Sequence, residues 1–173
     1  MLKDIKEYPS GGAEGIIFSK KWNVNMKVCA DSLERLELAE KCFNYFNELP
    51  QDVESRLKKY IFRYFSEYKK KFTEKEKSDF FDVNLDNILN YIDIYSLVID
   101  EYTHSDVIEF HVEGSCSWEI EHGIEITISS GKILYVGPCE GYAPNSYGIK
   151  KLIDENNFFD ESSSSNDNFA DKE

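Results

Sequence analysis

The chain has 173 residues, 41% of them hydrophobic, which fits a single domain that buries its own core. The N-terminus lacks the apolar core of a signal peptide, and no apolar run approaches the roughly 18 residues needed to span a bilayer, so we expect a cytoplasmic protein with no membrane part. The absence of a CxxC pair argues against a zinc knuckle or a thioredoxin-type site and predicts four small buried thiols, those of Cys29, Cys42, Cys116 and Cys139.

The net charge of −13 is concentrated in the second half of the chain. Residues 1–75 carry 15 Lys and Arg against 12 Asp and Glu, whereas residues 76–173 carry 5 against 21. Such an acidic half repels nucleic acid and attracts basic proteins. Basic side chains follow one side of residues 52–72, but because the domain as a whole is negative we expect a solvated helix face there and no nucleic-acid binding.

The first predicted elements are a pair of strands and a helix. Residues 15–28 mix β-branched and aromatic side chains with polar ones, which is typical of two short strands or a bent hairpin. A helix is predicted over residues 32–49, with Asp31 or Ser32 as its cap. Its apolar face contains Leu36, Ala39, Phe43 and Phe46.

A second helix is predicted to follow closely. Pro50 ends the first helix because proline disfavours the α conformation of the residue before it. Residues 52–72 repeat apolar side chains at helical spacing, and the short joint predicts an antiparallel helix pair. Residues 73–84 are expected to form a polar connector, and residues 85–91 to add one or two helical turns.

Beyond this point the apolar period changes to two. A strand is predicted over residues 94–101, and from residue 108 apolar and polar side chains alternate. The apolar series is expected to face the core and contains Ile108, Phe110, Val112, Gly114, Cys116 and Trp118. The opposite series is expected to face solvent and includes the acidic residues Glu109, Glu113 and Glu119.

The alternation resumes after residue 123 and predicts a C-terminal β-meander. Residues 124–129 add Glu125 to the acidic face, and Ser130 and Gly131 turn the chain into a strand that ends at Gly137. We therefore predict an α+β fold in which a mainly antiparallel sheet packs against a helix pair inserted between the N-terminal and C-terminal strands.

The domain organisation follows from composition. A single globular domain is expected over residues 1–158, with a short helix at 149–155. Residues 159–173 are acidic and rich in Ser and Asn, so we expect a disordered tail.

Residues 118–123, with the sequence WEIEHG, are the most concentrated group of chemically active side chains. One interpretation is structural: Trp118 is the last inward side chain, Gly123 adopts a positive φ, and Glu121 or His122 caps a turn by bonding to the backbone. The other is functional. It combines His122 with His111, Glu113, Glu119 or Glu125 as a divalent metal site or an acid/base pair.

This motif also resembles the hallmark of a bacterial family of unknown function, in which a tryptophan, an EHG triplet and an alternating strand precede a strand ending near Val-Gly. The matching positions are Trp118, Glu121, His122, Gly123 and Gly137. Members of that kind resemble immunity proteins encoded near polymorphic toxins. The resemblance implies no catalytic residue and no cofactor.

These observations favour a non-enzymatic protein-interaction domain. It would act as an immunity protein that neutralises a basic toxin through an acidic face made of Glu109, Glu113, Glu119 and Glu125. Two alternatives remain open. One is a metal-dependent or acid/base enzyme centred on Glu121 and His122, and the other is a scaffold domain.

Overall fold

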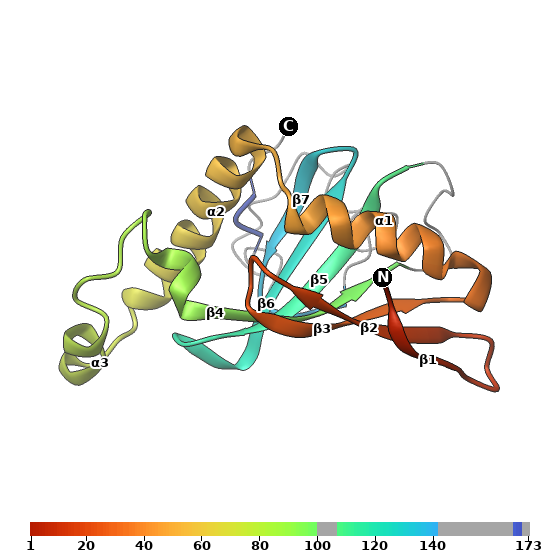
Figure 1. The fold of residues 1–173 in the computed structure, drawn as a ribbon. Helices are drawn as coiled ribbons and strands as arrows, with labels where there is room; N and C mark the ends of the chain where they lie inside the picture. The colour runs from red at the N-terminus through yellow and green to blue at the C-terminus, as the bar shows by residue number, and fades with distance from the viewer. Residues whose placement is uncertain (100–106, 142–167, 171–173) are drawn as a thin grey trace.

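The computed structural model describes residues 1–99, 107–141 and 168–170. Within them the chain forms one seven-stranded sheet whose strands lie in chain order (Figure 1). All neighbouring strands are antiparallel except β3 and β4. The strands are β1 Lys3–Glu7, β2 Ala13–Ser19, β3 Val24–Ala30, β4 Ile92–Val98, β5 Glu109–Cys116, β6 Glu119–Ser129 and β7 Lys132–Gly137.

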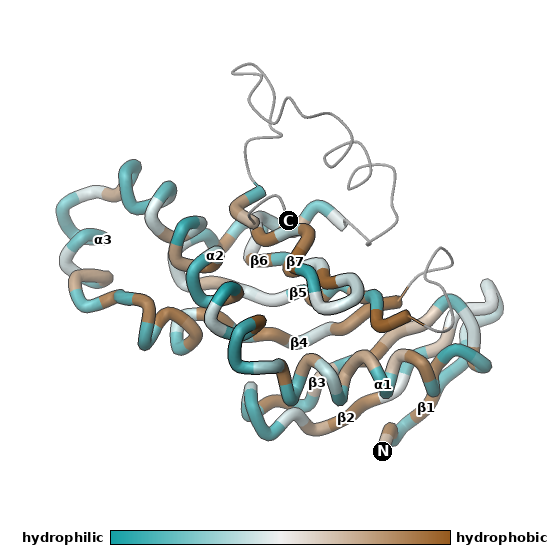
Figure 2. The backbone as a smooth tube through the Cα atoms, turned by 90° about the horizontal axis from the view of Figure 1, so that it is seen from above, coloured by the Kyte–Doolittle hydropathy of each residue, from teal (hydrophilic) through white to brown (hydrophobic). Residues whose placement is uncertain are grey.

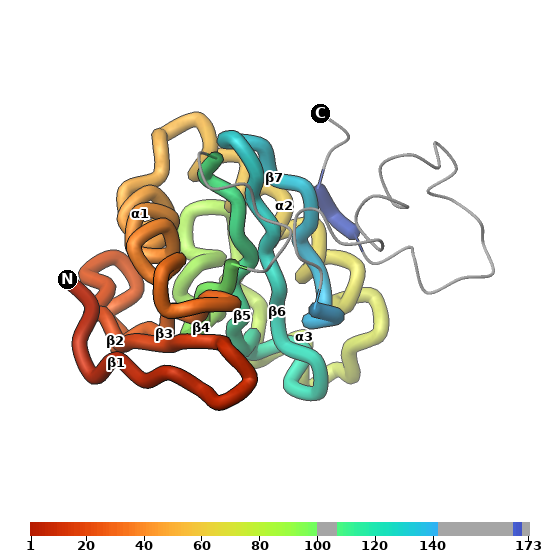
Figure 3. Tube along the Cα trace, turned by 90° about the vertical axis from the view of Figure 1, so that its right-hand side faces the viewer, coloured from red at the N-terminus to blue at the C-terminus, as the bar shows by residue number. Residues whose placement is uncertain are grey.

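The helices form the connection between β3 and β4. A parallel pair of strands needs a crossover of a dozen or more residues, and the helical segment supplies it. Its elements are the 3-10 helix η1 Leu33–Arg35, then α1 Leu36–Asn47, α2 Gln51–Lys69, α3 Glu74–Asp79 and the 3-10 helix η2 Ile88–Tyr91. Both long helices lie over the same face of the sheet (Figures 1 and 3). The predicted α+β fold, with helices inserted between two groups of strands and a C-terminal meander, is confirmed.

The core lies between the helices and this face of the sheet. Hydrophobic and hydrophilic residues alternate around the turns of α1, as expected for a helix with one buried face (Figure 2). Aromatic side chains fill much of the space. Phe46 of α1 stacks on Trp22 with ring centroids 5.4 Å apart, and Tyr64 and Phe65 of α2 meet Trp118 edge to face at 5.7 and 5.5 Å. Aromatic pairs of this kind add about 0.5–1.5 kcal/mol to the burial of their surfaces.

Three local features differ from the sequence-based predictions. β1 was not predicted, because its five residues are all exposed and show no apolar alternation. Neither candidate cap bonds the first helix as expected: Ser32 makes no side-chain cap bond, and Asp31 pairs with Arg35 at 3.0 Å. The polar connector contains α3, which begins with a capping box between Thr73 and Glu76.

The predicted helix at 149–155 lies outside the described residues. Of the tail that was predicted to be disordered, residues 168–170 are described, and they lie against β7.

Candidate functional site

The WEIEHG motif forms a wide bulge in β6. The hairpin turns at Ser117 and Trp118, and Cys116 pairs with Glu119. The next residue pair is Gly114 with Ile124, so four residues of β6 face a single residue of β5. Apart from Trp118, the motif thus lies not in the turn, as the sequence suggested, but in the irregular strand that follows it. The bulge presents Ile120, whose exposed fraction is 89%.

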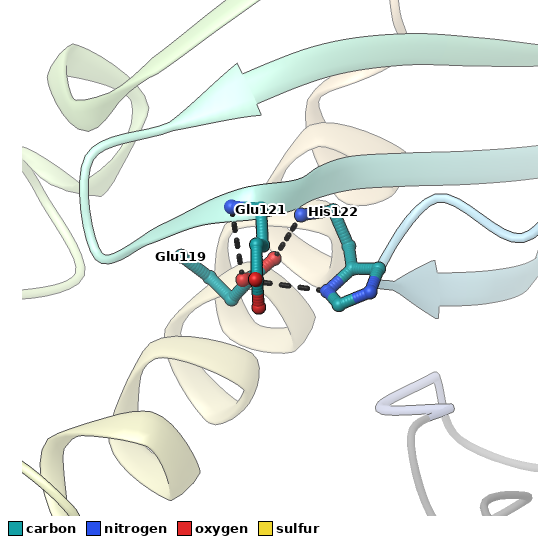
Figure 4. Close-up of side chains that lie close together, drawn as sticks. All are labelled: Glu119, Glu121 and His122. Carbon is teal, nitrogen blue, oxygen red and sulfur yellow. Dashed lines mark hydrogen bonds and ion pairs between the residues drawn. The ribbon is translucent and has the colours of Figure 1, made fainter.

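A buried carboxylate holds the bulge in place. Both oxygens of Glu119 accept backbone hydrogen bonds, Oε1 from the Glu121 N–H at 3.1 Å and Oε2 from the His122 N–H at 2.7 Å (Figure 4). The Nδ1 atom of His122 lies 3.4 Å from Oε1 of the same carboxylate. The residue that caps this backbone is therefore Glu119, and not Glu121 or His122 as predicted.

Gly123 has the positive φ that the sequence suggested, at +66°. It also lies against β5, because a Cβ at this position would be 2.3 Å from the Gly114 carbonyl oxygen. Its own carbonyl accepts a hydrogen bond from the Tyr64 hydroxyl at 2.9 Å. The glycine is thus required twice, for its backbone angle and for the close approach of the two strands.

Trp118 is buried, as predicted for the last inward side chain, with an exposed fraction of 7%. Its ring packs against Tyr64 and Phe65 of α2, so it joins the hairpin to the helix layer. Gly137, the last matching position of the hallmark, is the final residue of β7 and pairs with Glu125 of β6.

The acidic face expected on β5 and β6 is mostly not exposed. The exposed fractions are 7% for Glu109, 8% for Glu119 and 0% for Glu125. Glu109 accepts a hydrogen bond from the Ser129 hydroxyl at 2.7 Å, and Glu125 accepts the N–H groups of Glu140 and Gly141 at 2.8 and 2.7 Å. The expectation that these carboxylates face solvent is therefore wrong. Strand alternation shows which side chains share a face, but it does not show what covers that face.

The two histidines of the predicted site belong to separate pairs. His122 lies beside Glu119, whereas His111 lies with its Nε2 atom 3.6 Å from Glu113. The hydrogen bond with His111 lowers the pKa of the Glu113 carboxyl, and the charges of His111 and Lys27 act in the same direction against the opposing effect of burial. The structure therefore does not bring His122 together with His111, Glu113 or Glu125 as one ligand set.

The His111–Glu113 pair predicts a pH dependence of stability. A carboxyl whose pKa is lowered in the folded state stabilises the fold above its unfolded pKa, and this stabilisation is lost as the pH falls through the folded pKa. We expect the wild type to lose more stability between about pH 5 and pH 3 than a Glu113→Gln variant. Urea denaturation at a series of pH values measures this difference. Parallel curves for the two proteins would contradict it.

The cysteines differ in burial, although all four were predicted to be buried. Cys42 and Cys116 are buried, while Cys29 and Cys139 are partly exposed. Burial raises the pKa of the Cys42 thiol to about 11 and that of Cys116 to about 12.

Because the thiolate is the reactive form, we expect neither the Cys42 nor the Cys116 thiol to be alkylated by iodoacetamide at neutral pH until the chain is unfolded. Mass spectrometry of labelled peptides, with and without denaturant, measures this. Rapid labelling of Cys116 in the folded protein would contradict it.

A metal ion could be held at the bulge by three side chains. The ligand atoms of Glu119, Glu121 and His122 all lie within 4.8 Å of one another (Figure 4). Carboxylate and imidazole are suitable ligands for several divalent ions. However, both oxygens of Glu119 already accept backbone N–H groups, so a metal would share a carboxylate that is in use.

Sequence reasoning missed a second exposed feature, the segment 79–86, which we call the acidic loop. It contains Asp79, Asp82 and Asp86 and no basic residue. Within it Phe81 is 79% exposed and Leu85 is 46% exposed. Residues 79–84 were predicted to belong to a polar connector, and residues 85–86 to the helical turns that follow it. The signal that could have revealed it is the presence of three aspartates among four apolar side chains within eight residues.

Side-chain amides give the acidic loop a fixed shape. The Asn84 N–H donates to Asn87 Oδ1 at 2.8 Å, and Asn84 Oδ1 accepts the Asp86 N–H at 2.9 Å. The Tyr91 hydroxyl donates to Asp82 Oδ1 at 3.0 Å. Phe80, the neighbour of Phe81, turns inward and packs against the rings of Phe65, Phe72 and Tyr91. The exposed side chains are thus presented on an anchored backbone.

Among the helices in the described part of the chain, none is both long and apolar enough to cross a membrane. The chain matches neither a curated protein nor a solved structure. One family model matches residues 7–143, a range that contains strands β2 to β7, the last residue of β1, the helices described above and the WEIEHG motif. The chain therefore belongs to the family described as "Domain of unknown function (DUF6985)".

Proposed function

We propose that the chain is a non-enzymatic protein-interaction domain that binds a basic partner, in the way an immunity protein would neutralise a basic toxin. The observation that carries this proposal is the acidic loop. It combines an aromatic side chain that is 79% exposed with three aspartates on a backbone held by hydrogen bonds from the Asn84 and Asn87 side chains.

The chemistry of the acidic loop suits a basic protein surface. Exposed aromatic side chains often become the anchors of interfaces, and a backbone that is already ordered loses less entropy on binding. The three carboxylates and the net charge of −13 would speed association with a positively charged partner. The partner surface should therefore contain an apolar pocket for Phe81, surrounded by Lys or Arg.

Affinity capture from the native host tests the proposal, with the full chain as bait and Phe81→Ala as the comparison. We expect a basic protein that is retained by the wild type, eluted by salt, and lost from the Phe81→Ala chain. Ile5→Ala is the matched control, because Ile5 is also exposed, at 53%, but lies in β1. Removing a buried aromatic anchor typically costs about 2 kcal/mol or more of binding free energy, or about 30-fold in affinity.

The partner identified in this way must then bind the purified chain directly. Asp79→Asn, Asp82→Asn and Asp86→Asn in combination should slow association and weaken its dependence on salt. The proposal fails if the captured proteins are not basic, or if Phe81→Ala and Ile5→Ala retain the same proteins.

A metal-dependent activity at Glu119, Glu121 and His122 is the second candidate, because their ligand atoms lie close together. Equilibrium dialysis against Mn²⁺, Zn²⁺ and Ca²⁺ tests it with the wild type and His122→Ala. The variant suits this purpose because the His122 side chain is 57% exposed and is not needed for the core. Stoichiometric binding that His122→Ala abolishes would support the candidate. Equal uptake by both chains would remove it.

A further inference from the structure

We propose that the outer edge of β7 is a docking site for an extended peptide with the sequence Asn-Phe, and that the chain's own residues 168–170 occupy it as an intramolecular ligand. These residues lie beside β7 although they are more than 30 positions away in sequence (Figure 3). The proposal does not depend on the acidic loop or on any partner that binds there.

The contacts resemble those of an added strand. In the described sheet β7 is an edge strand, so the N–H and C=O groups on its outer side are open to another chain. The Phe169 N–H donates to the Val136 carbonyl at 2.8 Å. One main-chain bond of this kind, supplemented by side-chain bonds, is similar to β-augmentation, in which main-chain bonds give affinity and side chains give specificity.

The side chain of Asn168 extends this ladder. Its Oδ1 atom accepts the Val136 N–H at 3.2 Å, and its Nδ2 atom donates to the Leu134 carbonyl at 2.9 Å. The amide therefore bonds a donor and an acceptor of β7 as a peptide unit would. Aspartate has the same shape but lacks the donor, so the site should distinguish Asn from Asp.

Phe169 supplies the apolar contact. Its ring stacks on Tyr64 of α2 with centroids 5.2 Å apart, and its carbonyl accepts a bond from Arg63 at 3.5 Å. Tyr64 also contacts Trp118, and its hydroxyl donates a hydrogen bond to the Gly123 carbonyl. The docked Phe169 therefore packs on the same side chain that bonds the β6 bulge.

The docking site lies inside the range that the family model matches, and the docked residues lie outside it. Val136, Tyr64 and Arg63 lie within the matched residues 7–143, whereas Asn168 and Phe169 lie beyond them. A surface of this kind can bind the same sequence when it is offered as a separate peptide.

Fluorescence anisotropy with a labelled peptide of residues 164–173 tests this inference. The full-length chain carries Phe169→Ala, so that its own segment competes poorly. We expect saturable binding to this chain and at least about tenfold weaker apparent binding to the wild type, whose tethered segment occupies the site at high effective concentration. Peptides with Phe169→Ala or Asn168→Asp are the matched controls and should bind at least about tenfold more weakly.

Two results would overturn the proposal. The first is no saturable binding to a Phe169→Ala chain whose circular dichroism and unfolding match the wild type. The second is equal binding of the parent peptide, its two variants and an unrelated extended peptide.

A separate measurement covers the case in which Phe169→Ala does not fold. Asn168→Ala in the full chain removes the acceptor of the Val136 N–H, so it should speed hydrogen exchange at the Val136 amide and leave the Ile126 amide unchanged. Unchanged exchange at Val136 would also refute the site.

Discussion

Replacing Gly123 with alanine is expected to lower the free energy of unfolding by about 3–5 kcal/mol, or to prevent folding altogether. Two costs combine at this position. The φ of +66° is unfavourable for a residue with a Cβ, by about 1–2 kcal/mol. In addition, the new Cβ would lie 2.3 Å from the Gly114 carbonyl oxygen, a backbone atom that can move only if β5 and β6 separate. Urea denaturation followed by circular dichroism measures the effect.

Gly141→Ala is the matched control for this substitution. Gly141 also has a positive φ, +75°, but a Cβ there meets nothing within 4 Å. It should therefore cost only the backbone strain, about 1 kcal/mol. The difference between the two variants isolates the close approach of β5 and β6. Equal destabilisation would show that the strands tolerate a methyl group at Gly123, against the geometry described above.

The fold was predictable where the spacing of apolar side chains alone determined which residues are buried. The apolar face of α1 and the inward-facing series from Phe110 to Trp118 both follow from a hydrophobic core, and both are confirmed. β1 was not predictable in this way, because none of its residues is buried. Its pairing with β2 depends on backbone bonds, which leave little trace in side-chain composition.

The candidate site was predictable only in part. Gly123 was correctly assigned a positive φ, since a glycine next to a hairpin often takes this role. The prediction of a solvent-exposed acidic face is wrong in part because Glu125 accepts hydrogen bonds from the backbone of Glu140 and Gly141. These two residues follow β7, and the alternation pattern of the strands does not include them. A buried carboxylate and a solvated one look alike in sequence.

The acidic loop and the docked tail were missed for a related reason. Phe81 and Leu85 stand out only because their neighbours Phe80 and Val83 turn inward, and that division comes from tertiary packing. Asn168 and Phe169 occur in a segment of low complexity, whose composition predicts disorder. Their contacts with β7 depend on a few specific groups that overall composition does not reveal.

Replacing Glu119 is expected to have the second large effect. Glu119→Ala leaves the N–H groups of Glu121 and His122 without their acceptor, and we expect a loss of about 2–3 kcal/mol in the free energy of unfolding. Glu119→Gln should lose less, about 1–2 kcal/mol, because the amide can accept one of the two bonds while its NH₂ group faces the other donor. Chemical denaturation measures both, and hydrogen exchange at the two amides locates the change.

Glu121→Gln is the control, since this side chain is exposed and its loss should change stability by no more than about 0.5 kcal/mol. The same three variants also separate the two interpretations of the WEIEHG motif. If Glu119 serves the backbone, the order of stability holds with or without divalent metal. If it serves a metal, adding the ion should stabilise the wild type but not Glu121→Gln, because a ligand that binds only the folded state raises its stability. A Glu119→Ala chain as stable as Glu121→Gln would refute the backbone role, and the bulge would then need another source of its shape.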